Sequence, residues 1–106
     1  MSKAQDDVLL ERKRQIKVEG WSHSHDDNHD AGALAAAGAA YALEASCKLN
    51  PYSQQGLEAG PPEFWTWDTK WWKPKDPRRD LVRAAALIIA EIERMDRIPM
   101  YRRGRL

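Results

Sequence analysis

The clearest apolar pattern of the chain lies in its last third, at Leu81, Ala85, Ile88, Ile92 and Met95. Successive members of this stripe are separated by four or three residues, a spacing that places side chains on one face of an α-helix. An Asp-Pro pair at 76–77 precedes the stripe, and it supplies a good N-cap followed by proline at the first helical position. The pattern predicts a helix over residues 77–97 with the stripe in the protein core.

A second helix is predicted over residues 4–18. Four apolar residues recur between Val8 and Val18 at helix-compatible spacing, so one face of this segment is expected to pack against the rest of the protein. Glu11 and Gln15 lie within the same stripe. Polar groups at such positions need hydrogen-bonding partners once they are buried.

A third helix is predicted over residues 29–48. Nine of these residues are alanine, which has the highest helix propensity. The absence of a side chain at Gly32 and Gly38 costs about 1 kcal/mol each in helix stability, but it lets a neighbouring helix approach closely. The polar residues 26–28 (Asp-Asp-Asn) precede the segment as candidate N-caps.

The stretch between the helices predicted over residues 29–48 and 77–97 does not have a helical pattern. Residues 50–76 contain four of the five tryptophans and four of the six prolines, without a helical period. A segment of this length and composition is usually functional or held in place by its own side chains. We expect most of its tryptophans to cover the apolar end of a helical bundle, with one or two left to contact a ligand.

These segments predict an all-α fold, a small helical bundle of three main helices with a long Trp/Pro-rich insert between helices two and three. The chain of 106 residues is expected to form one domain, 1–106, with a basic tail at 99–106. A bundle of this size has a marginal core, and its Ala/Gly-rich helix favours contact with a partner. We therefore expect a homo-oligomer.

Charge and composition restrict the function less than they restrict the fold. The formal net charge is +1, which gives no general argument for binding nucleic acid or an anionic membrane. Residues 20–50 are acidic and residues 78–106 contain eight arginines, so intramolecular pairing is one interpretation and a bound ion is the other. With one cysteine and no apolar stretch long enough to span a bilayer, the chain is expected to be cytoplasmic.

Four residues are candidates for a polar or metal-binding centre: Glu11, Asp27, His29 and Glu91. Carboxylate and imidazole groups suit first-row metals, and carboxylates alone suit magnesium. Glu11 and Glu91 lie on or beside the apolar stripes of different helices, where two carboxylates can share a metal or a proton. The alternative is that these glutamates pair with arginines and that Asp27 and His29 are a cap and a solvated side chain.

The sequence also resembles a family of small, largely uncharacterised proteins encoded by tailed phages and prophages. The resemblance extends from about residue 8 to residue 97. It includes residues 11–15 (Glu-Arg-Lys-Arg-Gln), 19–21 (Glu-Gly-Trp), 26–29 (Asp-Asp-Asn-His), 65–67 (Trp-Thr-Trp), 71–74 (Trp-Trp-Lys-Pro) and 78–94. It implies a phage protein in the cytoplasm of a bacterial host.

A looser similarity is to the all-α MazG-like nucleotide pyrophosphohydrolases, in which helix-borne acidic pairs bind magnesium and activate water. This chain has the pair Glu93-x-x-Asp96, but in its first helix only Glu11 fits the family pattern. The similarity implies Mg²⁺ or Mn²⁺ as the metal, with Trp71, Arg79 and Arg83 holding the base and phosphates of a nucleotide.

Two functional hypotheses follow from these observations. The first is a MazG-like nucleotide-binding protein, which would be a metal-dependent nucleotide pyrophosphohydrolase if it is an enzyme. The second is a non-catalytic phage accessory or anti-defence protein that binds a host protein or sequesters a nucleotide signal. Binding of DNA ranks third, because it rests only on the arginines after residue 77.

Overall fold

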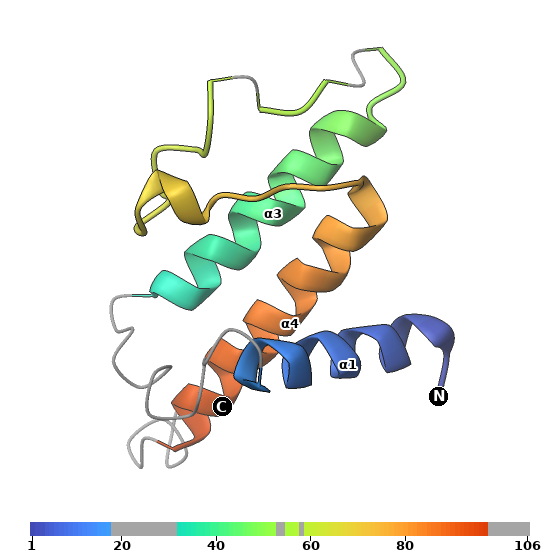
Figure 1. The fold of residues 1–106 in the computed structure, drawn as a ribbon, viewed down its shortest axis with the longest axis vertical. Helices are drawn as coiled ribbons and strands as arrows, with labels where there is room; N and C mark the ends of the chain where they lie inside the picture. The colour runs from blue at the N-terminus through green and yellow to red at the C-terminus, as the bar shows by residue number, and fades with distance from the viewer. Residues whose placement is uncertain (18–31, 53–54, 58, 98–106) are drawn as a thin grey trace.

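Three α-helices account for most of the chain that the computed structural model describes, which is residues 1–17, 32–52, 55–57 and 59–97 (Figure 1). The helices are α1 (Lys3–Lys17), α3 (Ala33–Leu49) and α4 (Pro77–Asp96), and a short 3₁₀ helix, η1 (Thr69–Trp71), precedes α4. No strand occurs within the described ranges. The predicted all-α fold with three main helices is confirmed.

The core lies between α3 and α4, which run antiparallel beside each other (Figure 1). Leu34 and Leu87 are completely buried there, surrounded by alanines of both helices. A Cβ atom added to Gly38 would lie 3.1 Å from the carbonyl oxygen of Ala84. The predicted close approach at Gly38 is therefore confirmed.

The predicted burial of the α4 stripe is wrong. Leu81, Ile88 and Ile92 are 42 %, 44 % and 51 % exposed. The side chains that α4 buries are instead Asp80, Val82, Ala84, Ala86, Leu87, Ala90 and Glu91. Small side chains allow the backbones of α3 and α4 to approach closely, and the larger residues of the stripe remain at the margin of the contact.

The start of α3 also differs from the prediction. The helix begins at Ala33 and follows Gly32, which has a φ of 76° and provides no side-chain cap. Such a left-handed conformation favours glycine because it has no Cβ atom. The expected N-cap residues 26–28 lie outside the described residues, as do 29–31.

Helix α1 packs across α4 through polar side chains (Figure 1). Its buried residues are Glu11, Arg12 and Gln15, whereas Leu9 and Leu10 are exposed. The expected apolar contact is confirmed only in part, because Val8 and Ile16 are half-buried and Val8 lines a hollow with Ile89 of α4, while the most buried positions of α1 are polar. This polar contact is the structural basis of the candidate site.

The second half of the insert packs on α3 through aromatic side chains. The Tyr41 ring stacks on Trp72 with centroids 4.9 Å apart, and Trp65 meets both rings edge-on. The Tyr41 hydroxyl donates to the carbonyl of Trp71 and accepts from the amide of Lys73. The expectation that most of these tryptophans cover the apolar core is confirmed, since Trp65, Trp67 and Trp72 all pack there.

None of the described helices combines the length and the apolar character that crossing a bilayer requires.

Candidate functional site

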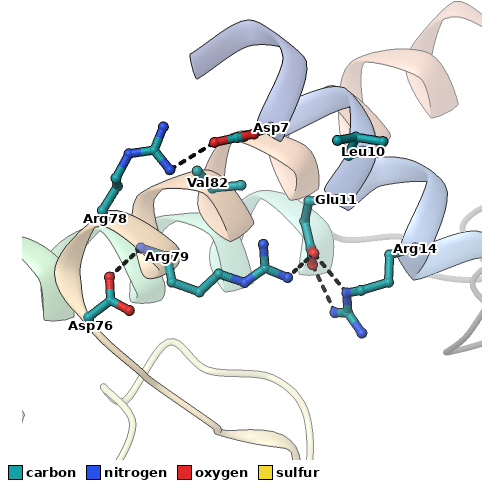
Figure 2. A pocket seen from close by; sticks show the side chains of 8 residues that line it. All are labelled: Asp7, Leu10, Glu11, Arg14, Asp76, Arg78, Arg79 and Val82. Atoms are coloured by element: carbon teal, nitrogen blue, oxygen red, sulfur yellow. Dashed lines mark hydrogen bonds and ion pairs between the residues drawn. The ribbon is translucent and has the colours of Figure 1, made fainter. Parts of the chain in front are cut away.

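A cavity of about 350 Å³ lies between α1 and the start of α4 (Figure 2). Its wall contains three arginines and three carboxylates beside two apolar side chains, namely Arg14, Arg78, Arg79, Asp7, Glu11, Asp76, Leu10 and Val82. The formal charges of the wall therefore cancel. We call this space the α1–α4 cavity.

Local sequence explains how these groups come to face one space. On α1, Asp7, Glu11 and Arg14 are four and three residues apart and so share one helix face. On the other side, the Asp76 carboxylate caps α4 by accepting the backbone amide of Arg79 at 2.9 Å. This hydrogen bond holds the pKa of Asp76 below its ordinary value.

Glu11 is the central side chain of the cavity wall, and its side chain is completely buried. Arg14 donates two hydrogen bonds to it, Nε to Oε1 at 2.7 Å and Nη2 to Oε2 at 2.9 Å. Arg79 from α4 donates to Oε1 from the opposite side (Figure 2). One carboxylate thus connects a guanidinium of its own helix with one of the crossing helix.

The charge of Glu11 is maintained by these neighbours. Burial by itself raises the pKa of the carboxyl group, because it penalises the charged form. The hydrogen bonds and positive charges of Arg14 and Arg79 outweigh the effect of burial, so the pKa of Glu11 lies below its ordinary value. Glu11 is therefore an anion at neutral pH, although its side chain is buried.

Gln15 extends this network away from the cavity. It is 0 % exposed, and its Nε2 donates to Glu11 Oε2 at 3.2 Å. Among the described residues, no group donates a hydrogen bond to Gln15 Oε1. A buried acceptor without a donor lowers stability by about 1–3 kcal/mol. Gln15 Oε1 is thus a buried oxygen next to Glu11 that accepts no hydrogen bond from the described residues.

A second ion pair closes the exposed side of the cavity. The Asp7 carboxylate lies 2.8 Å from Lys3 Nζ and 2.9 Å from an Nη atom of Arg78. The hydrogen bonds from Lys3 and Arg78 lower the pKa of Asp7. Since Arg78 is 55 % exposed, this pair contributes less to stability than the Glu11 pairs do.

The predicted metal-binding residues are only partly described. Glu91 is buried and accepts hydrogen bonds from Arg94 Nε at 2.6 Å and from the Ala35 amide at 3.3 Å. The contacts described for Glu91 and for Glu11 thus involve different arginines. Asp27 and His29 lie outside the described residues, and within the described ranges no three His, Cys, Asp or Glu side chains form a group that could hold a metal.

Of the three predicted nucleotide-binding residues, one lies at the α1–α4 cavity and two lie at the insert. Arg79 lines the α1–α4 cavity. Arg83 instead donates to the carbonyl of Lys73 at 2.6 Å and lies over the Tyr41 ring, so it fastens the insert. Trp71 is 51 % exposed and has the ammonium groups of two lysines, Lys70 and Lys73, 5.5 Å from its ring centroid.

Four charged residues of the cavity wall, Asp7, Arg14, Asp76 and Arg78, are not among the site residues predicted from the sequence. The helical spacing of Asp7 and Arg14 relative to Glu11 was a usable signal, because all three residues share one face of the predicted helix. Arg78 lies in the first turn of α4, where free amides favour anions, but its contact with Asp7 depends on where α1 crosses α4.

A second buried polar cluster holds the insert and is separate from the cavity wall. Asp80 accepts the Lys75 amide at 2.8 Å, and Glu44 accepts the Leu57 amide at 2.6 Å. Burial raises the pKa of Asp80. These bonds go to backbone amides of the insert, which gives the two carboxylates a structural role.

Comparisons of the chain with protein-family models, with curated proteins and with solved structures found no match. The geometry and charges of the α1–α4 cavity define the site as a polar, charge-balanced one between two crossing helices.

Proposed function

We propose that the chain binds a nucleotide together with a divalent cation at the α1–α4 cavity. The observation that carries this proposal is the buried, ionised Glu11 carboxylate, held between Arg14 and Arg79 at the wall of a cavity. At such a position the carboxylate and the guanidinium groups can separate from each other and bind the positive and negative groups of a ligand that carries both. The MazG-like similarity stated from the sequence points to the same class of ligand.

The charge balance of the wall favours a metal–phosphate ligand over either ion alone. A phosphate by itself would meet three carboxylates, and a cation by itself would meet three arginines. A metal–nucleotide complex satisfies both sets, because carboxylate oxygens suit Mg²⁺ or Mn²⁺ and guanidinium groups bind phosphate oxygens in pairs. Glu11 and Asp7 would face the cation, and Arg14 and Arg79 would face the phosphates.

One or two protein carboxylates are sufficient for such a cation. Magnesium in nucleotide sites usually keeps several waters and takes other ligands from the phosphates. A metal held in this way lowers the pKa of a bound water and can activate it for attack on a phosphate. Asp27 and His29 remain predicted contributors to the same centre.

The proposal is tested by calorimetric titration of the full chain with nucleoside triphosphates, with Mg²⁺ and with chelator. Binding is expected only when metal and nucleotide are both present. Arg14→Met should weaken it about tenfold or more, because a charge-assisted hydrogen bond contributes about 1.5–3 kcal/mol. Lys13→Met, which removes an exposed cation from the same helix, should bind like the wild type.

Two results would count against nucleotide binding. One is the absence of any heat or thermal shift with every nucleoside triphosphate and metal tried. The other is an equal affinity of the Arg14→Met and Lys13→Met variants. Release of pyrophosphate, measured in the same samples, separates a hydrolase from the alternative proposal, an accessory protein that sequesters a nucleotide signal without turnover or binds a host protein.

We also propose that the chain self-associates in the bacterial cytoplasm. The reason is the small core: it consists of four alanines with Leu34, Tyr41, Trp65 and Leu87, and a core of this size gives limited stability to a single copy. Sedimentation equilibrium of the full chain measures this directly, and a monomer at all concentrations would contradict it.

A further inference from the structure

One surface of the α3–α4 pair is apolar and exposed. It includes Ala35, Ala39 and Ser46 of α3 and Leu81, Ile88 and Ile92 of α4, and we call it the α3–α4 face. Leu81 and Ser46 line one hollow together, and Ile88 lies against Gly38. Ala35, Ala39 and Ser46 share a helix face by their spacing, so the six residues belong to one surface.

The α3–α4 face is also free of charge on its α3 side. Between Ala33 and Cys47 the only charged residue is Glu44, which is 3 % exposed and accepts a hydrogen bond from the Leu57 amide of the insert. A helix that faces water usually carries charged side chains on its outer face. Contiguous apolar surfaces of this kind on soluble proteins mark interaction sites.

The two ends of the face expose different features. At one end, an open hollow of about 550 Å³ is lined by Ala42, Ser46, Leu49 and Leu81 among others. At the other end, Ile92 is 51 % exposed, and Ala35 of α3 lies close by, since its amide donates to the adjacent Glu91. An exposed apolar side chain and an open hollow thus lie at opposite ends of an antiparallel helix pair.

We infer that the α3–α4 face is the contact surface of a two-fold homodimer. A two-fold axis across the middle of the face would place Ile92 of each copy over the hollow of the other, which is the self-complementarity that an isologous contact requires. In this arrangement the α4 stripe of each copy would lie antiparallel to that of its partner, with the two α3 helices opposite each other, and the four helices would form a bundle. This inference rests on the proposed self-association and specifies which surface forms the contact.

Size and charge both favour a second copy as the occupant. Two adjacent helices about 10 Å wide and about 25 Å long offer roughly 500 Å² in projection. This projected area is of the order of the ~800 Å² of accessible surface that each partner contributes to a standard interface. The α3 side of the face has no exposed charge between Ala33 and Cys47. It therefore offers no charge complementarity to an acidic or basic partner, and pairing of two copies brings no like charges together there.

The test compares Ala39→Glu with Ala4→Glu by sedimentation over roughly a hundredfold range of concentration. Both positions are exposed on helices, and glutamate is a good helix former, so the fold of one copy is expected to persist. The carboxylate introduced by Ala39→Glu would be desolvated in the dimer, so the dissociation constant should rise about a hundredfold or more. Ala4→Glu should dimerise like the wild type.

The outcomes separate the inference from the proposals on which it depends. A wild-type dimer that Ala39→Glu and Ile92→Glu leave intact would overturn the α3–α4 face, while self-association would stand. A monomeric wild type would overturn both. Circular dichroism of each variant verifies the helix content, and nucleotide titration of Ala39→Glu should match the wild type because the α1–α4 cavity lies elsewhere.

Discussion

Glu11 shows how a single charged residue can lie at the most buried position of a helix contact. It is completely buried, yet it remains ionised because Arg14 and Arg79 contribute hydrogen bonds and positive charge. Both arginines are about one-third exposed, at 32 % and 33 %. Forming these ion pairs therefore requires full desolvation of the carboxylate but only partial desolvation of the two guanidinium groups.

The acid stability of the protein is expected to depend on Glu11. Because the pKa of Glu11 is lower in the folded chain than its ordinary value of 4.5, the unfolded chain binds more protons between these two values. The stabilisation is complete above the ordinary value and is lost as the pH falls through the folded pKa. Denaturant titrations across this range should show a decline in the free energy of unfolding that Glu11→Gln reduces.

At neutral pH, Glu11→Gln should lower the free energy of unfolding by about 2 kcal/mol, which is less than for a fully buried pair since the arginines can rehydrate. The matched control is Glu93→Gln, which removes a carboxylate that pairs with Arg12 at 3.0 Å but has a side chain 45 % exposed. Its effect should be below about 1 kcal/mol. Equal effects of the two substitutions would contradict the central role of Glu11.

At the scale of elements, the insert is attached to α3 by stacking and by backbone hydrogen bonds. Trp72 stacks on Tyr41, and Lys48 Nζ donates to the carbonyl of Lys75 at 2.7 Å. The neighbouring Trp71 is half exposed and contacts lysine ammonium groups instead. Two adjacent tryptophans thus have different roles, one in packing and one at the surface.

Replacing these tryptophans one at a time should separate the two roles. Trp72→Ala removes a partly buried ring and should cost about 3 kcal/mol of stability. It should also speed hydrogen exchange of the amides of residues 73 and 75. Trp71→Ala should change the free energy of unfolding by less than about 1 kcal/mol, and a larger loss from this variant than from Trp72→Ala would refute the assignment.

At the scale of the whole molecule, the three helices are joined by two kinds of contact. α3 and α4 share an apolar core, whereas α1 meets α4 through ion pairs such as Asp7 with Arg78 and Arg12 with Glu93, beside a smaller apolar region that includes Val8 and Ile89. Salt screens exposed ion pairs but leaves apolar contacts in place. High salt is therefore expected to weaken the α1–α4 contact and to leave the α3–α4 core in place.

Raising sodium chloride to about 1 M, where the screening length is about 3 Å, should loosen α1 ahead of the other helices. Hydrogen exchange measured by mass spectrometry is expected to speed up in peptides from α1. Peptides from the middle of α3 and α4 serve as the internal control and should exchange as slowly as at low salt. A uniform increase, or none in α1, would contradict this division.

The sequence by itself determined the helices, because the signals that define them are local. Alanine content predicted α3, the Asp76–Pro77 pair predicted the start of α4, and the missing side chain of Gly38 predicted a close helix contact. It also singled out Glu11 and Arg79, which the structure brings together. These features depend on backbone propensity, capping and side-chain size within a few residues.

Only the tertiary structure decided which faces of the helices are buried. Residues 77–97 offer a large apolar stripe and an alanine-lined face, and the core uses the alanine-lined one because it allows closer backbone packing. The crossing of α1 over α4 likewise decided that Asp7 meets Arg78 and that Glu11 meets Arg79. The second of these contacts joins residues 68 positions apart in the sequence, and no local pattern encodes it because it depends on how whole helices cross.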